Sequence, residues 1–237
     1  MPLKRILVVT AVLLTTLLSL AHLLQTASAT PNATTLLYDS SLGTLPSDQS
    51  FSYQALDRFN PFDVQASQTY SSPITLLNTA NDQNEYAGYT VTQAAMPTLN
   101  RATGFQLRFD LRILSENHAN NDRAGFNVIL LSEDLYGVEM AFWENEIWVQ
   151  KGNTPGSEPF GHEEGVLYNT TNALTSYELT VISNTYLLAA NGTPLLSGSL
   201  RQYTDWVPPI MGLPDPYEQP NQLFWGMTLH PPGQKFG

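Results

Sequence analysis

The 237-residue sequence predicts an all-β fold, a jelly-roll β-sandwich of two antiparallel sheets. Three observations predict it. Apolar and polar residues alternate strictly through Phe105–Ile113, which places one face of a strand in a core and the other in water. Pro, Gly and Asn interrupt the chain at short intervals, and no segment sustains a helical period. Short turns join successive apolar segments, as expected of stacked antiparallel sheets.

The N-terminus has the features of a secretory signal. Lys4 and Arg5 precede an apolar run, Ile6–Leu24, and Ala27-Ser28-Ala29 supplies small residues for a signal peptidase. The alternative is a retained membrane anchor, because the apolar run is near the length that spans a bilayer. We expect a signal peptide over 1–29 and its cleavage.

The remaining residues, 30–237, are expected to form one domain, with no membrane insertion after cleavage. Without Lys4 and Arg5 the basic residues number 10 − 2 = 8 against 21 acidic ones, a charge of 8 − 21 = −13. This charge argues against nucleic acid as a partner and fits an extracellular or cell-surface protein, or a periplasmic one. The absence of cysteine excludes disulfides, thiolate nucleophiles and cysteine metal sites.

Further strands are predicted in order along the chain. After the polar loop Ser115–Arg123, the segment Gly125–Leu131 is apolar except at Asn127, which favours a central strand. Tyr177–Ala190 reads as two strands with a tight turn near Ser183–Thr185. The pair Asn191-Gly192 then favours a type I′ turn, because both central positions need positive φ. The last two strands are expected at Thr193–Leu200 and Gln222–Leu229.

The segment Val138–Lys151 predicts a hairpin with its turn at Glu144-Asn145. Side chains alternate across a strand, so one face of the hairpin is apolar and the other mixes aromatic and polar groups. The expected cross-strand pairs are Met140 with Val149, Phe142 with Ile147, Ala141 with Trp148 and Glu139 with Gln150.

The mixed face suggests a sugar-binding platform on a concave sheet. Trp143 and Trp148 would stack on a sugar ring, and Glu139, Glu146 and Gln150 would accept hydrogen bonds from its hydroxyl groups. The alternative is that both tryptophans pack under a loop or against another domain, because large aromatic side chains are more often buried than exposed.

Three segments carry a family resemblance: GFQLRFDLRILSE (104–116), DRAGFNVILLSEDLYGVEMAFWENEIWVQ (122–150) and YELTVISNTYLLAANGTPLLSG (177–198). Together they resemble secreted bacterial proteins, common in cyanobacteria, that carry a choice-of-anchor domain. That domain is similar to the concanavalin A-like lectin/glucanase superfamily, a laminin-G-type jelly roll. The resemblance covers about residues 70–230. It implies the fold but not an activity, because this superfamily includes lectins, hydrolases, lyases and adhesion modules.

The loop after the first alternating strand is a candidate calcium site. Asn117, Asn120 and Asp122 offer amide and carboxylate oxygens at close spacing, and calcium prefers oxygen ligands. The alternative is an ordinary polar loop with Asx turns.

Catalysis has weaker support in the sequence. A retaining glycosidase needs two carboxyl groups about 5–5.5 Å apart. Glu139, Glu144 and Glu146 are the nearest candidates, but the Glu-x-Asp-x-x-Glu run of the superfamily's bacterial glucanases is absent. His162-Glu163-Glu164 has no second histidine at metal-binding spacing and is expected to be a solvated loop.

These observations favour a secreted or surface-associated carbohydrate-binding, lectin-like module without catalysis, with a polysaccharide or cell-surface glycan as partner and Ca²⁺ as a candidate cofactor. Two alternatives stay open. One is a glycan-cleaving enzyme of the same superfamily. The other is a structural adhesion protein with a surface protein as partner, which predicts that Trp143 and Trp148 are buried.

Overall fold

The computed structural model describes residues 34–57, 59–60, 63–79, 85–118, 121–122, 125–153, 160–208 and 215–228. The expected signal peptide, 1–29, lies outside the described residues. No helix among the described residues has the length and apolar character needed to cross a membrane.

The described chain is built from β-strands, with two 3₁₀ turns, η1 (Ser40–Leu42) and η2 (Pro46–Asp48), near its start. The strands are β1 (Phe51–Asp57), β2 (Ser67–Ser71), β3 (Ile74–Asn78), β4 (Glu85–Val91), β5 (Phe105–Leu111), β6 (Phe126–Leu131), β7 (Gly137–Phe142), β8 (Glu146–Gln150), β9 (His162–Leu167), β10 (Thr175–Ile182), β11 (Thr185–Ala190), β12 (Thr193–Ser199) and β13 (Leu223–Met227).

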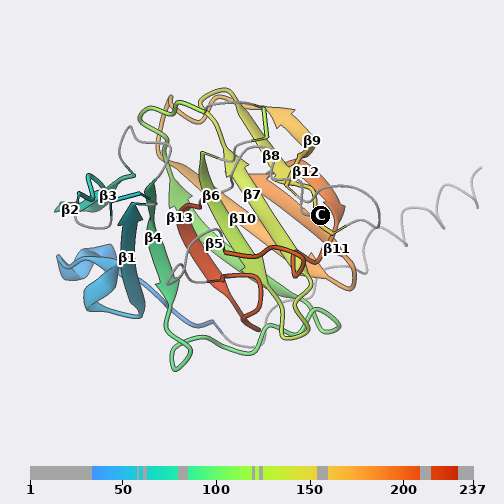
Figure 1. Cartoon of the computed structure of the whole chain (residues 1–237). Helices are drawn as coiled ribbons and strands as arrows, with labels where there is room; N and C mark the ends of the chain where they lie inside the picture. The colour runs from blue at the N-terminus through green and yellow to red at the C-terminus, as the bar shows by residue number, and fades with distance from the viewer. Residues whose placement is uncertain are drawn as a thin grey trace, which may run out of the picture. The chain divides into compact units, whose positions relative to one another are not determined.

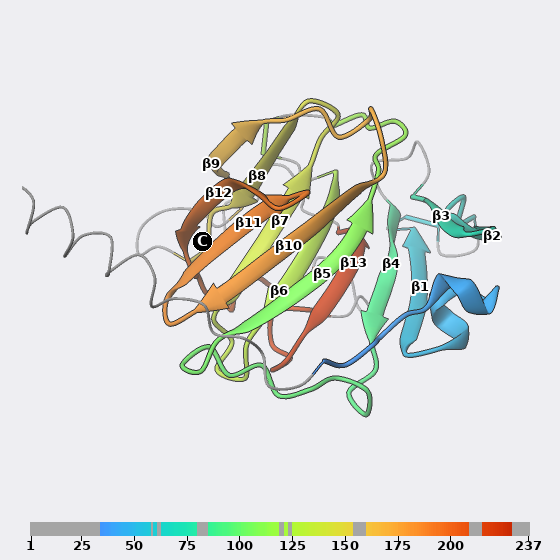
Figure 2. The ribbon, with the colours of Figure 1, turned by 180° about the vertical axis from the view of Figure 1, so that it is seen from behind.

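The strands form two stacked sheets, which confirms the predicted antiparallel β-sandwich. The larger sheet has the order β1-β4-β13-β6-β7-β8-β9 and the smaller β12-β11-β10-β5, while β2 and β3 pair separately. Their strand pairs are antiparallel. The seven-stranded sheet faces the viewer in Figure 1, and the four-stranded sheet faces the viewer in Figure 2.

The main core lies between the two sheets and is rich in aromatic rings. Phe109 of β5 stacks on Tyr177 of β10, with ring centroids 5.5 Å apart, and both rings contact Phe142 of β7 edge-on. Edge-to-face and offset ring pairs stabilise a core beyond the area that they bury. The apolar face of the alternating segment at β5 therefore points into this core, as its pattern predicts.

The two predicted hairpins are present, and β7 with β8 has the expected register. In β7 and β8, Met140 pairs with Val149, Ala141 with Trp148 and Phe142 with Ile147. In β10 and β11, Tyr177 pairs with Ala190, Leu179 with Leu188 and Val181 with Tyr186. Asn191 and Gly192 both have positive φ, 49° and 78°, as a type I′ turn requires.

Strand β4 lies inside the large sheet although its sequence has no clean alternation. It carries Gly88 at its centre, opposite Gly226 of β13. A Cβ atom at Gly88 would collide with the Phe224 ring and the Trp225 carbonyl oxygen, so a side chain there is incompatible with this packing. The glycine that interrupts the apolar pattern is therefore a packing requirement of the strand.

Strand β9 corrects the expectation of a solvated loop at His162-Glu163-Glu164. These residues begin the edge strand of the seven-stranded sheet, next to β8. Alternation of half-buried and exposed residues along β9 is typical of an edge strand with one face against the protein. The sequence shows no alternation of apolar and polar residues here, because Glu163 and Glu164 are both polar although their side chains point to opposite faces of the strand.

The outer face of the seven-stranded sheet is also covered. Coil from the C-terminal part of the chain, in red tones, crosses in front of this sheet in Figure 1. Its side chains pack with the sheet residues in a second buried cluster. The members of this cluster are Tyr86, Ile129, Leu131, Tyr203, Trp206, Tyr217 and Phe224.

Candidate functional site

The two tryptophans of the predicted platform are buried in the structure. Trp148 on β8 is 0% exposed and Trp143, just after β7, is 5% exposed. Their indoles meet edge to face, with centroids 5.3 Å apart. The expectation that these rings face solvent is therefore wrong.

Two histidines occupy the faces on which a sugar would stack. His162 of β9 lies parallel to Trp148, and His118 lies parallel to Trp143 with ring centroids 3.8 Å apart. Each imidazole is also anchored by a carboxylate, since His162 Nε2 is 3.0 Å from Glu146 Oε1 and His118 Nδ1 is 2.8 Å from Glu116 Oε2. Two histidines of the protein itself therefore cover the tryptophan rings that were expected to bind a sugar.

The expected polar rim is mostly buried as well. Glu139 and Gln150 are both 0% exposed, whereas Glu146 is half-buried beside His162. The Tyr217 hydroxyl donates to Glu139 Oε2 at 2.5 Å, and the Asn127 amide donates to Glu139 Oε1. Burial of a carboxylate is tolerable when such hydrogen bonds satisfy it, so Glu139 belongs to an internal polar network rather than to an open rim.

The candidate calcium residues lie in a loop that the structure describes in part. Asn117 and Asp122 are exposed, and Asn120 lies outside the described residues. Asp122 Oδ1 accepts a hydrogen bond from the His162 backbone N–H at 3.1 Å. Among the described residues, no three His, Asp or Glu side chains come together as a metal site. Calcium binding by these three residues stays a prediction.

The carboxylates considered for catalysis have separate surroundings. Glu139 is buried in the network with Tyr217, and Glu146 contacts His162. Glu144 is exposed at the hairpin tip, and its Oε1 accepts a hydrogen bond from the Glu116 backbone N–H at 3.1 Å. The geometry therefore gives each glutamate a bonding role in the fold.

A hollow of about 260 Å³ opens where β8 and β9 meet the segment after β12. Its volume lies below the roughly 300–1,000 Å³ of pockets that enclose drug-sized ligands, so it suits a single sugar-sized unit. The sequence reasoning did not identify this place. The residues that line it are Tyr136, Lys151, Gly152, Asn153, Glu163, Leu200, Arg201 and Gln202.

Several polar groups of the hollow have no partner within the described part of the chain. The Nη1 atom of Arg201 is buried and donates to no acceptor there. The side chains of Lys151, Glu163 and Gln202 also form no hydrogen bond or ion pair with described residues. Unpaired donors and acceptors at one concave place are the usual polar complement of a small-ligand site.

Arg201 is held rigidly on the wall of the hollow. Its Nη2 donates to Glu164 Oε2, and the Tyr186 hydroxyl donates to Glu164 Oε1 at 2.7 Å. Burial alone would lower the pKa of Arg201, but the hydrogen bond to Glu164 and the nearby Tyr203 raise it above its ordinary value. The guanidinium is therefore a permanent positive charge. Only the fold brings it beside Lys151, fifty positions earlier in the sequence.

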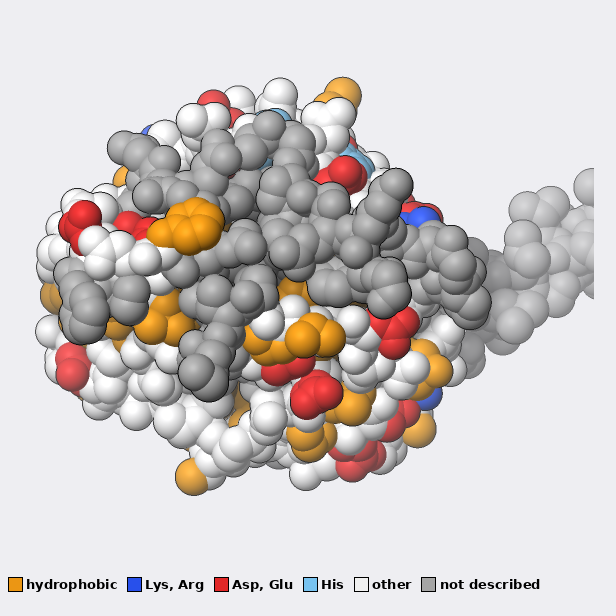
Figure 3. All heavy atoms as spheres, in the orientation of Figure 1, with side chains coloured by type: hydrophobic (Ala, Val, Ile, Leu, Met, Phe, Trp, Pro, Cys, Tyr) orange, Lys and Arg blue, Asp and Glu red, His pale blue; other side chains and the backbone are white. Residues whose placement is uncertain are grey.

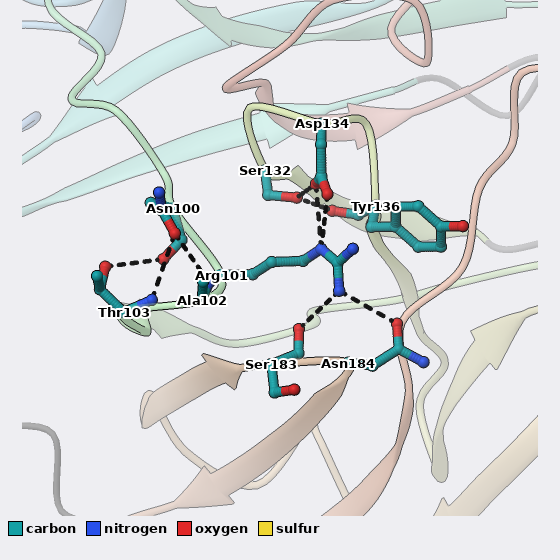
Figure 4. Close-up of polar contacts among 9 residues, drawn as sticks. All are labelled: Asn100, Arg101, Ala102, Thr103, Ser132, Asp134, Tyr136, Ser183 and Asn184. Carbon is teal, nitrogen blue, oxygen red and sulfur yellow. Dashed lines mark hydrogen bonds and ion pairs between the residues drawn. The ribbon is translucent and has the colours of Figure 1, made fainter.

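A second arginine joins loops at one end of the sandwich and has a structural role. Figure 4 shows the Arg101 side chain between the Ser132–Tyr136 turn and the β10–β11 turn. Its Nε donates to Asp134 at 2.8 Å, its Nη1 donates to the Ser183 carbonyl at 3.1 Å, and its guanidinium lies 4.4 Å from the centre of the Tyr136 ring. Tyr136 thus connects this junction to the hollow.

No protein-family model matches the chain, and no curated protein matches it. Among solved structures, a carbohydrate esterase from the Shiga toxin-encoding bacteriophage phi24B is similar over 76% of this chain and 83% of its own, with 11% identity and a TM-score of 0.37. The Crh5 transglycosylase in complex with NAG is similar over 74% of this chain and 68% of its own, with 12% identity and a TM-score of 0.31.

Proposed function

We propose that this chain is a secreted or surface-associated carbohydrate-binding module, and that its ligand enters the hollow between β8, β9 and the segment after β12 rather than stacking on Trp143 and Trp148. The observation that carries the proposal is the set of unpaired donors and acceptors lining that hollow. Sugar hydroxyls both donate and accept hydrogen bonds, so they complement Lys151 and Gln202 as well as Glu163.

The scaffold supports such a role. The hollow borders paired strands and the anchored Arg201 side chain, so the backbone that carries its polar groups and the Arg201 guanidinium are fixed before a ligand arrives. Preorganised groups lose little conformational entropy on binding. The predicted export signal and the strongly acidic composition also fit a protein that meets glycans outside the cell.

The direct test is binding of the purified chain to an oligosaccharide array, followed by titration calorimetry. We expect Lys151→Ala and Gln202→Ala each to weaken binding without lowering the melting temperature. Arg108→Ala is the matched control, because Arg108 is an exposed cation on β5 of the other sheet. Binding that survives both hollow variants would place the ligand elsewhere, and an array without any bound sugar would remove the proposal.

A structural adhesion protein is the second candidate, favoured by one specific observation. Burial of Trp143 and Trp148 is what that alternative predicts. A structural adhesion protein would bind a protein partner and no sugar, so the oligosaccharide array distinguishes the two functions.

A further inference from the structure

The hollow holds two basic side chains of an acidic protein. The structure describes five basic residues, and two of them, Lys151 and Arg201, line the hollow. Elsewhere Arg101 pairs with Asp134 and Arg108 with Glu178. Figure 3 shows carboxylate side chains in several places on the face viewed there and few basic ones. Among the described basic residues, Lys151 and Arg112 have no carboxylate partner, and Lys151 lies at this concave place.

The two cations are unequally compensated. Arg201 is paired with Glu164, yet its buried Nη1 lacks an acceptor among the described residues. Lys151 has no carboxylate partner there. Because Nη1 is buried, the Lys151 ammonium is the donor that a ligand oxygen can reach from the hollow. A negatively charged oxygen binds this ammonium more strongly than a hydroxyl does, because hydrogen bonds between ionised groups are about twice as strong as neutral ones.

Glu163 is the opposing charge on the lip of the hollow. It lies on β9 and is exposed, so water screens it more than it screens Arg201. Its presence makes the sign of the ligand testable, since removing a positive and a negative group should change affinity in opposite directions.

We propose that the hollow selects glycans that carry a carboxylate, such as uronic acid residues, with Lys151 donating to the carboxylate and the Arg201 guanidinium adding positive charge on the wall of the hollow. This inference rests on the proposed function, because it names the class of sugar that the same hollow takes. Specificity for the charged group follows from the unpaired Lys151 ammonium, while the sugar hydroxyls meet Gln202 and Tyr136.

The test uses pairs of ligands that differ only in charge. Trisaccharides of galacturonate, glucuronate and mannuronate are titrated, as free acids and as methyl esters, into the protein that comprises residues 30–237. We expect at least one free acid to bind about tenfold more tightly than its ester, and added salt to narrow this difference. Sodium acetate at the same carboxylate concentration should not compete, which separates a glycan-borne carboxylate from a free one.

Three variants assign the effect to the hollow. Lys151→Gln should weaken binding of the acid about tenfold and leave binding of the ester unchanged. Glu163→Gln should strengthen binding of the acid. Arg108→Gln should change the affinity for neither the acid nor the ester.

Equal binding of acid and ester, with no opposite effects of Lys151→Gln and Glu163→Gln, would overturn selection by charge and leave the glycan-binding function standing. Failure of every trisaccharide, charged or esterified, together with an empty oligosaccharide array, would remove the proposed function and this inference with it.

Discussion

The imidazole of His162 lies flat on the indole of Trp148, with ring centroids 4.2 Å apart and planes 10° from parallel. The two residues belong to neighbouring strands, β9 and β8, at the edge of the seven-stranded sheet. His162 also approaches Glu146 Oε1 and donates its backbone N–H to Asp122, so several contacts hold it over the indole. The edge strand is thereby tied to the sheet by its first side chain.

Replacing His162 with alanine should uncover Trp148 and destabilise the fold. Loss of the stacked pair and the contact with Glu146 is expected to lower the free energy of unfolding by about 1–2 kcal/mol. Urea unfolding measures this change, and acrylamide quenching of tryptophan fluorescence should increase. Glu163→Gln, at the next and exposed position, is the control; equal quenching in both variants would contradict the covering role of His162.

The buried carboxylate of Glu139 should be a major stabilising group. In Glu139→Ala, the Tyr217 hydroxyl and the Asn127 amide lose their buried acceptor, which is expected to cost about 2–4 kcal/mol. Thermal and urea unfolding check the loss. Tyr217→Phe combined with Glu139→Ala should cost less than the sum of the single changes, because both remove the same bond. Strict additivity would show that the two groups act independently.

Stability should decrease in acid partly through Glu164. Burial raises the pKa of this carboxyl, but hydrogen bonds from Arg201 and Tyr186 lower it by more in total, so its folded pKa lies below the ordinary value. The stabilisation is therefore complete above the unfolded pKa of about 4.3 and is lost as the pH falls through the folded pKa. The stability difference between wild type and Glu164→Gln should shrink over that range; a difference independent of pH would refute the linkage.

Arg101 should resist conservative replacement. Arg101→Lys keeps the charge but loses the planar fork that reaches Asp134 and the Ser183 carbonyl together, and it weakens the contact with Tyr136. We expect a loss of about 1 kcal/mol, measured by urea unfolding, because this junction is partly exposed. Arg112→Lys serves as the comparison, since Arg112 donates to a single carbonyl oxygen. A smaller loss of stability for Arg101→Lys than for Arg112→Lys would contradict the role of Arg101 in joining the two turns.

The sequence by itself determined the strands whose neighbours are close in the chain. Alternation at 105–113 located β5, the pair Met140–Val149 followed from the turn at 144–145, and the turn near 183–185 separated β10 from β11. Period-two patterns and short turns carry this information because a hairpin's register depends on a few adjacent residues.

The tertiary structure alone decided what covers each face of the large sheet. Trp143, Glu139 and Gln150 form a mixed face that looks solvated in the sequence, yet His162 of β9 and Tyr217 of the distant connection bury it. The hollow likewise needs Lys151 and Arg201 side by side, from strand ends fifty positions apart. Local periodicity reports that a face is polar or apolar, but burial and proximity depend on segments that meet only when the chain has folded.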